Sequence, residues 1–486
     1  MPNFDAREVA QWTGGKWCFG QPDAIAGVST DSRTLCHGAL FVALRGPLFN
    51  GHSFIAEAFA RGAVGAVISE NTCAMPRENC PLLRVPDTAQ ALRDMAANYR
   101  RRIQVEIVAV TGSVGKTTVK EMVADVLARR LRVVRTRGNW NNEIGLPLSM
   151  LAMEPETRVG VFELGMNHPG ELALLCRMLQ PDWGLVTTIG PVHLEFFKSV
   201  EAIAAEKSTL LKSLPAGGVA VLRCDEPYFE ILRAAAPDRV ITLALGGTSR
   251  VDGTSRVDGT NRVGGEADYI GAPPDAQGQM EIRERATGEA CRLQAPLPGA
   301  HHAANTLYAV AVGRAHGLAW EEIRAALESY RSPPMRWERQ IVAGVTIIND
   351  AYNANPVSMA AALRTFAELP LAELPVAGGR WLVLAGMLEL GLSEEQWHRD
   401  LGKSLAPGPW TGIITIGSLG AVIAREAVNA GVNAARVFPC ADNGAAAEVL
   451  SRCLQPGDAV LVKASRGQHL EQVLALWKER VAASGI

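Results

Sequence analysis

The segment VEIVAVTGSVGKTTVKEM, residues 105–122, joins an apolar strand to a glycine-containing loop and then to an amphipathic helix. A loop that binds phosphate through its backbone N–H groups requires this order of strand, loop and helix. The spacing departs from the common form, in which a glycine precedes Gly-Lys-Ser/Thr by four residues. Counting back from Lys116 puts Val110 where that glycine belongs, and Gly112 follows two residues later. The segment is therefore either a shortened phosphate loop or a helix N-terminus with an incidental lysine.

The residue types in this loop suit a nucleotide phosphate. Gly112 and Gly115 permit a tight turn, so that backbone N–H groups and the helix N-terminus face an anion. Lys116 adds a positive charge that can reach terminal phosphates, and Thr117 offers a hydroxyl to Mg²⁺. The apolar strand before the loop favours the phosphate-binding hypothesis.

Two polar residues follow the next apolar strands along the chain. Glu163, in VFELGMNHPGE, ends a strand that looks buried, where an unpaired carboxylate is costly. His193, in GPVHLEFF, comes just after the following strand, at the sheet edge where open α/β folds bind ligands. A salt-bridged core Glu163 and a structural His193 are the alternative interpretations. Together with the loop, the two residues predict a metal-assisted phosphate site.

Strands and helices continue to alternate, which predicts an α/β fold with a mostly parallel sheet covered by helices. Two prolines in YRSPPMRW mark a boundary, and a further alternating region follows it. Length also favours three domains, which we predict at 1–103, 104–331 and 332–486. The strands of the central domain are expected at 105–113, 158–165, 183–190, 217–225 and 239–246.

The stretch GGTSRVDGTSRVDGTNRVGG, residues 246–265, contains a six-residue unit three times. Three such turns are too few to bury a β-helix core. The stretch is rich in glycine and polar residues, so we expect a mobile surface insertion without chemistry of its own.

The composition excludes several classes of protein. A net charge of −2 over 486 residues gives no reason to expect nucleic acid or an acidic membrane as a partner. No apolar run reaches the ~18 residues of a membrane helix. The start of the chain lacks a secretory pattern, and nine scattered cysteines without a CxxC pair argue against a disulfide framework. The prediction is a cytoplasmic protein.

Several segments, in this order, resemble the Mur ligase family, whose members use the shortened phosphate loop. They are GSVGKTT (112–118), GNWNNEIGLPLSML (138–151), ELGMNHPGE (163–171), HLEFFKSVEAIAAEK (193–207) and INDAYNANPVSM (348–359). TDSRTLCHGALFVALRGPLFNGHSF (30–54) is similar to the amino-terminal uridine-nucleotide domain of that family. The resemblance covers nearly the whole chain. It implies a central P-loop ATPase domain between this α/β domain and a carboxy-terminal Rossmann-like α/β domain.

Within the family, DAYNANP favours the branch that adds D-alanyl-D-alanine to UDP-N-acetylmuramoyl-tripeptide. The motifs Asp-Tyr-Ala-His-x-Pro and Asp-Asn-Pro-Arg of a neighbouring branch do not occur. The resemblance implies a monomer that uses ATP and Mg²⁺ and works through an acyl phosphate. A related ligase with a different amine acceptor and a non-catalytic nucleotide-binding homologue are the alternatives.

The resemblance also implies roles for individual residues. Lys116, His193 and Lys207 are expected to be catalytic, with Lys207 carbamylated and supporting a second Mg²⁺. The metal ligands are expected to be Thr117, Glu163, His193 and Lys207. ATP is expected to contact Gly112, Ser113, Gly115, Lys116, Thr117, Thr118, Asn305, Arg336, Asp350 and Asn353. The other substrates are expected to contact Asp31, Ser32, Arg33, Asn139, Asn142, Tyr352 and Asn355.

Two positions depart from the pattern of the family. His302 stands where the family has the first Asn of His-Asn-x-x-Asn, and an imidazole can still stack or form hydrogen bonds. In LAGMLELG, Ala385 and Gly386 replace the usual Gly-Asp, which removes an acidic side chain. We expect this second change to alter the dipeptide pocket.

Overall fold

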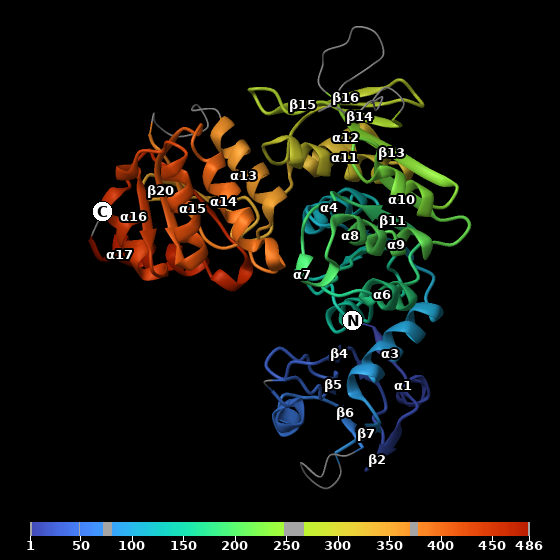
Figure 1. The fold of residues 1–486 in the computed structure, drawn as a ribbon. Coiled ribbons are helices and arrows are strands. Elements are labelled where there is room, and N and C mark those ends of the chain that lie inside the picture. Colours follow the sequence, from blue (N-terminus) through green and yellow to red (C-terminus); the bar gives the residue numbers. More distant parts are fainter. Residues whose placement is uncertain (1, 48, 71–79, 247–266, 370–377, 485–486) are drawn as a thin grey trace.

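The computed structural model describes residues 2–47, 49–70, 80–246, 267–369 and 378–484. Most of its strands belong to three sheets, one in each third of the chain. In Figure 1 the amino-terminal sheet lies at the bottom, the central sheet at the upper right and the carboxy-terminal sheet at the left. The predicted insertion at 246–265 lies, apart from Gly246, outside the described residues.

The amino-terminal sheet has the order β2-β7-β6-β5-β4, in which only β2 is antiparallel to its neighbour. The elements of this domain are β1 (Asn3–Phe4), α1 (Ala6–Thr13), β2 (Lys16–Cys18), β3 (Ile25–Ala26), β4 (Val28–Ser29), β5 (Leu40–Val42), α2 (Ile55–Ala60), β6 (Gly65–Ser69), β7 (Leu82–Val85) and α3 (Thr88–Arg102).

Helix α3 connects this domain to the next one. It begins where the Asp87 carboxylate accepts hydrogen bonds from the N–H groups of Ala89 and Gln90. N–H groups in the first turn of a helix have no acceptor within the helix, so this cap stabilises its start. The helix packs against α1 and also against α5 and α6 of the central domain. Its Arg100 donates to the carbonyls of Leu179 and Gln180 at the end of α6. The two domains therefore share a packed helix.

The central sheet has the order β16-β15-β14-β13-β12-β11-β8-β10-β9, parallel from β9 to β14 and antiparallel at β15 and β16. Its strands are β8 (Glu106–Thr111), β9 (Val133–Arg135), β10 (Val159–Glu163), β11 (Trp183–Val186), β12 (Val219–Arg223), β13 (Arg239–Leu245), β14 (Tyr269–Gly271), β15 (Gln279–Glu284) and β16 (Ala290–Gln294). Its helices are α4 (Lys116–Leu127), α5 (Gly145–Met150), α6 (Glu171–Leu179), α7 (Leu194–Phe197), α8 (Val200–Lys207), α9 (Thr209–Lys212), α10 (Phe229–Ala235), α11 (Ala300–Ala315) and α12 (Trp320–Glu328).

The inner part of β8, residues 107–110, is apolar because helices cover both faces of the sheet. Val108 and Val110 belong to the core that contains residues of α4 and α11. Ile107 and Ala109, which point to the opposite face, belong to the core that contains residues of α3, α5 and α6. Both faces of β8 are therefore closed to water, and its carboxyl end is free for a ligand.

The carboxy-terminal sheet has the order β17-β18-β22-β19-β20-β21, and only β17 is antiparallel. Its strands are β17 (Glu338–Val342), β18 (Val345–Asn349), β19 (Arg380–Leu384), β20 (Trp410–Ile416), β21 (Val437–Cys440) and β22 (Ala459–Lys463). The helices are α13 (Pro356–Glu368), α14 (Glu394–Ser404), α15 (Gly417–Asn429), α16 (Asn443–Cys453) and α17 (Glu471–Ser484).

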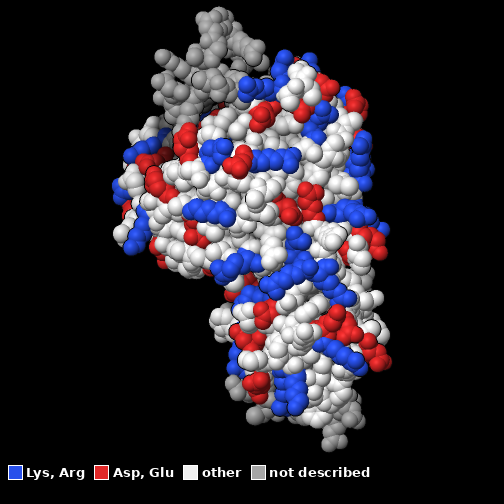
Figure 2. Space-filling view, turned by 90° about the vertical axis from the view of Figure 1, so that its right-hand side faces the viewer, with Lys and Arg blue, Asp and Glu red and all other residues white. Residues whose placement is uncertain are grey.

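The structure confirms the predicted α/β class with mostly parallel sheets. The domain boundaries at 103/104 and 331/332 stay predictions. Lysine, arginine, aspartate and glutamate side chains are intermixed on the face shown in Figure 2. No helix in the described part of the chain combines the length and the apolar composition that a membrane span needs.

Candidate active site

The shortened loop follows directly from the length of β8. Val110, at the position of the missing glycine, is buried inside the strand and pairs with Glu163 of β10. The strand therefore runs further than in a loop of the common form, and the turn is confined to residues 112–115. Gly115, with a φ of +91°, precedes α4, which begins at Lys116. The N-terminus of α4 thus faces the space above the sheet.

The loop is held by the segment that follows β11. The Thr187 hydroxyl donates to the carbonyl of Val114 over 2.6 Å, and the Ser113 N–H donates to the carbonyl of Thr188 over 2.8 Å. Gly112 has a φ of +148°, and a Cβ there would lie 1.8 Å from Thr187 Oγ1. A glycine is therefore required for reasons of both backbone conformation and space.

Glu163 is the buried acid of the site, with 1% of its surface exposed. Its Oε2 accepts a hydrogen bond from the Thr117 hydroxyl over 2.6 Å, and its Oε1 accepts one from Asn141 Nδ2 over 2.7 Å. Lys116 Nζ donates to the Gly112 carbonyl over 2.8 Å. Burial lowers the pKa of Lys116, and the nearby Glu163 opposes that shift. A carboxylate and a hydroxyl side by side are hard oxygen ligands, as Mg²⁺ prefers.

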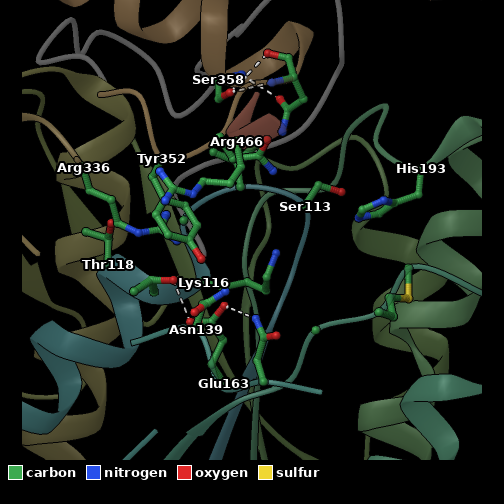
Figure 3. A pocket seen from close by; sticks show the side chains of 18 of the residues that line it. Ser113, Lys116, Thr118, Asn139, Glu163, His193, Arg336, Tyr352, Ser358 and Arg466 are labelled. Atoms are coloured by element: carbon green, nitrogen blue, oxygen red, sulfur yellow. Dashed lines mark hydrogen bonds between the residues drawn. The ribbon is translucent and has the colours of Figure 1, made fainter. Parts of the chain in front are cut away.

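A cavity of about 620 Å³ opens above this group, and the carboxy-terminal domain forms its other side. In Figure 3, Lys116, Asn139 and Glu163 lie at one end, Ser358 and Arg466 at the other, and His193 opposite Arg336 and Tyr352. The predicted site residues that line the cavity are Ser113, Gly115, Lys116, Thr117, Thr118, Asn139, Asn142, Glu163, His193, Asn305, Arg336, Asp350, Tyr352, Asn353 and Asn355.

The carboxy-terminal side of the cavity is built around Asp350, which follows β18. Its Oδ2 accepts a hydrogen bond from Lys463 Nζ of the neighbouring strand β22 over 2.6 Å. Lys463 also donates to the carbonyl of Asn353 over 3.1 Å. The guanidinium of Arg336 lies 3.9 Å from the ring centroid of Tyr352, in a cation–π contact. These contacts fix the two segments of the carboxy-terminal domain that face the phosphate loop.

Two of the predicted substrate residues also have structural roles. Asn142 Oδ1 accepts from the N–H groups of Ile144 and Gly145 as α5 begins. Asn355 Oδ1 accepts from the Ser358 N–H over 2.9 Å and so caps α13. Both asparagines line the cavity at helix N-termini, where backbone N–H groups favour anions.

His193 joins the central domain to the carboxy-terminal one. Its Nδ1 lies 2.5 Å from Oε2 of Glu389, and this contact keeps the pKa of Glu389 below its ordinary value. Both residues have positive φ angles, so each sits in a sharply turned segment. His193 is therefore oriented by a residue from another domain.

Asn305 and Lys207 flank the phosphate loop in different ways. A Cβ on Gly115 would lie 2.6 Å from Asn305 Oδ1, so Asn305 packs directly against the loop. Lys207, at the end of α8, is 2% exposed and, in the part of the chain described, does not line the cavity. Burial, reinforced by the positive charge of Lys116, lowers its pKa well below the ordinary value.

The predicted residues of the amino-terminal domain lie apart from the cavity. Asp31 accepts two hydrogen bonds from the guanidinium of Arg33, both at 2.9 Å, and this contact lowers the pKa of Asp31. Ser32 donates to Glu57 over 3.2 Å. These three residues form a group of their own at the carboxyl end of β4.

The structure shows what surrounds the two residues that depart from the family pattern. His302 lies buried beside the rings of His301 and Trp337, and neither of its ring nitrogens has a hydrogen-bond partner among the described residues. A Cβ on Gly386 would lie 2.7 Å from the Leu419 side chain. An aspartate there would therefore require Leu419 to move.

Sequence reasoning did not assign Asn141, Lys463, Glu389 or Arg466 to the site. Asn141 stands between two assigned asparagines in GNWNN, so a motif pointed to its segment, whereas Lys463 ends β22 and Arg466 follows it shortly after. Glu389 stands in LAGMLELG, but that motif gave no sign of a contact with His193, which is far away in the sequence. Only the fold brings these two together.

Three segments match known domains. Residues 24–100 match the Mur ligase family, catalytic domain; residues 110–313 match the Mur ligase middle domain; and residues 335–466 match the Mur ligase, glutamate ligase domain.

Individual relatives match over almost the whole chain. The UDP-N-acetylmuramoyl-tripeptide–D-alanyl-D-alanine ligase of Bacillus subtilis (strain 168) is 35% identical over 451 residues, which are 93% of this chain and 92% of that protein. The protein of the same name from Escherichia coli (strain K12) is 31% identical, over 93% of each chain. A crystal structure of MurF from Acinetobacter baumannii has a TM-score of 0.83 and 29% identity, with 99% of both chains covered.

The geometry of Gly112 gives a first prediction. In Gly112→Ala the new methyl group meets Thr187 Oγ1, so the loop must move, and we expect ATP affinity to fall by about tenfold or more, because small displacements of positioning groups are costly. Gly431→Ala is the matched control, since it has a positive φ but no atom within 4 Å of the new Cβ. Calorimetric titration with ATP measures both, and equal affinities in the two variants would contradict the prediction.

Proposed function

This chain belongs to the Mur ligase family, and we propose that it is the ATP-dependent ligase that joins D-alanyl-D-alanine to UDP-N-acetylmuramoyl-tripeptide. One observation carries the proposal. A single cavity brings the phosphate loop and Glu163 together with Arg336, Asp350 and Tyr352 of the carboxy-terminal domain. The relatives named for this reaction match over more than nine tenths of the chain.

The nucleotide would bind with its phosphates on the loop. Residues 113–115 and the N-terminus of α4 line the cavity, where a helix N-terminus favours an anion. Lys116 is the cation closest in sequence to these groups, and its ammonium can leave the Gly112 carbonyl for a phosphate oxygen. Asn305, against the same loop, and Asp350, Asn353 and Arg336, across the cavity, would contact the remainder of ATP.

Mg²⁺ fits the donors at the base of the cavity. Glu163 and Thr117 present hard oxygens, and His193 and a carbamylated Lys207 would complete the sites. When bound, the metal would neutralise charge on the phosphate groups. The protein contributes the orientation of Glu163, which Asn141 and Thr117 hold from two sides.

The reaction forms an amide from a carboxylate, which first needs activation. A carboxylate oxygen of the tripeptide attacks the γ-phosphorus of ATP, the bond to the β–γ bridging oxygen breaks, and an acyl phosphate and ADP result. The amine of D-alanyl-D-alanine then attacks the acyl carbon, and phosphate leaves from the tetrahedral intermediate as the amine loses a proton. Lys116 stabilises the charge that builds on the transferring group.

The three domains would divide the substrates among them. Asp31, Ser32 and Arg33 form a separate polar group in the amino-terminal domain, and we assign the uridine nucleotide to it. The tripeptide would extend from there to Asn139 and Asn142 at the cavity. Tyr352 and Asn355 face it from the carboxy-terminal domain. Because one chain supplies both sides of this cavity, we propose a monomer, acting in the cytoplasm where ATP is available.

A ligase with another amine acceptor is the second candidate. Gly386 lacks the acidic side chain of the family pattern, and Leu419 fills the space beside it. An acceptor pocket that has lost a carboxylate would hold a free amine less tightly. This observation concerns the acceptor and leaves the activation step unchanged.

Mass spectrometry of the products tests the proposal. We expect ADP, phosphate and a UDP-linked pentapeptide when ATP, a UDP-linked tripeptide and D-alanyl-D-alanine are all present. Tripeptides with meso-diaminopimelate or lysine in third position, and a panel of other amines, form the comparison. ATP turnover without any amide product would contradict the proposal, and a product with a different amine would favour the second candidate.

Lys116→Ala should lower kcat far more than it lowers stability. The ammonium acts mainly while charge develops on the transferring group, so its loss should cost about 10²–10³-fold in kcat. The side chain makes one hydrogen bond to its own loop, so the unfolding temperature should change little. Steady-state kinetics and thermal unfolding measure the two effects. Near-normal turnover would exclude a phosphate role for Lys116.

Lys207 is expected to react with CO₂ as a neutral amine, forming an N–C bond and losing a proton. Its burial and the charge of Lys116 both favour the neutral amine. Lys207→Ala should abolish most activity, and acetate or formate should restore part of it by replacing the carboxylate. Protein exchanged into ¹³C-bicarbonate should give a carbamate NMR signal that is missing from the alanine variant. Full activity of that variant would contradict the assignment.

A further inference from the structure

Lys120 is a fully buried lysine on α4, one turn after Lys116, and none of its surface is exposed. Its Nζ donates to the carbonyl of Thr136 over 2.8 Å and to the carbonyl of Gly138 over 3.1 Å. The same nitrogen forms an ion pair with Oε1 of Glu121 at 2.6 Å. An ammonium has three N–H donors, and here each of them has an acceptor.

The two carbonyls belong to the segment of residues 136–142, between β9 and α5, which we call the asparagine segment. It supports Glu163 at two points. Thr136 Oγ1 accepts a hydrogen bond from the Glu163 N–H over 2.9 Å, and Asn141 Nδ2 donates to Glu163 Oε1 over 2.7 Å. The backbone and the carboxylate of Glu163 are therefore both held by the segment that Lys120 holds.

We infer that Lys120 is a positioning residue, which fixes the asparagine segment so that Asn141 orients Glu163 at the phosphate loop. The inference rests on the proposed function, since Glu163 is its point of action. Lys116 and Lys120 lie on one face of α4, four residues apart. Helix α4 therefore has two roles. Its Lys116 faces the proposed phosphate site, and its Lys120 fixes the segment that orients Glu163.

A purely structural role would not need a charge at this position. Burying an ammonium is costly unless it is fully hydrogen-bonded, and an apolar side chain of similar length would fill the same space. Glu121 does not depend on Lys120, because its other oxygen pairs with Arg135 at 2.6 Å. What Lys120 alone supplies is the pair of hydrogen bonds to the asparagine segment.

Lys120→Met removes these hydrogen bonds and keeps the chain length. The matched control is Arg100→Met, because Arg100 is also a largely buried cation that donates to two carbonyls, of Leu179 and Gln180, and pairs with a carboxylate, Asp182. Both variants lose similar contacts, and Arg100 lies outside the cavity lining.

In Lys120→Met we expect kcat/KM for ATP to fall by about ten- to a hundredfold, as for a displaced positioning group. Amide hydrogen exchange in residues 138–142 should become faster in the same variant. Arg100→Met should keep kcat/KM for ATP within about twofold of the unmodified protein, and exchange in residues 138–142 should not change. Equal effects of the two variants on these readouts would overturn the inference.

A double-mutant cycle with Asn141→Ala tests the route of action. If Lys120 acts through Asn141, the double variant should lose little more ATP affinity than Asn141→Ala alone. Additive losses, measured by calorimetric titration, would overturn the inference. Lys120→Gln, which keeps an amide donor group on a shorter side chain, replaces Lys120→Met if that variant does not fold, and its ATP affinity should be lower than that of the unmodified protein. Failure of the unmodified protein to form amide product would instead reject the proposed function and leave these binding measurements valid.

Discussion

The parallel pairing of β8 with β10 is the constraint on which the site depends, because it places Val110 beside Glu163. Thr111 ends β8 directly after this pair, and the phosphate loop begins. A slip by one residue would turn the carboxylate to the other face of the sheet, away from Thr117. With this register, the hydroxyl and the carboxylate meet at 2.6 Å. The remaining parts of the site, from Asn141 to the Thr187–Val114 hydrogen bond, hold this arrangement in place.

In the carboxy-terminal domain, too, two neighbouring parallel strands bring a pair of polar side chains together. β18 and β22 are parallel neighbours, and the residues at their carboxyl ends, Asp350 and Lys463, form an ion pair in which the lysine is buried and the aspartate is partly exposed. Parallel strands bring side chains that are far apart in sequence to one edge. The cavity therefore lies between the carboxyl edges of two sheets, with the glycine loop and Glu163 on one side and Arg336 and Tyr352 on the other.

Much of this could be predicted from the sequence, because it depends on local patterns. The order of strand, loop and helix identified the loop, and strand ends identified Glu163 and His193. The partners could not be predicted in the same way. Glu389 meets His193 through tertiary contact alone, and Lys120 looks like any polar residue of an amphipathic helix until Thr136 and Gly138 are seen beside it. The placement of Asp31, Ser32 and Arg33 apart from the cavity is likewise a property of the domain arrangement.

Helix α3 has a mechanical consequence. It packs on α1 at one side and on α5 and α6 at the other, and its Arg93 binds Glu143, which lies between the asparagine segment and α5. A rotation of the amino-terminal sheet would thus move α3, whose last turn contacts the end of α6 through Arg100 and whose Arg93 contacts Glu143. The amino-terminal domain is therefore connected to the central one by a packed helix and not by an unpacked linker. A ligand that displaces the amino-terminal domain would therefore also shift the contacts that α3 makes with α5, α6 and Glu143.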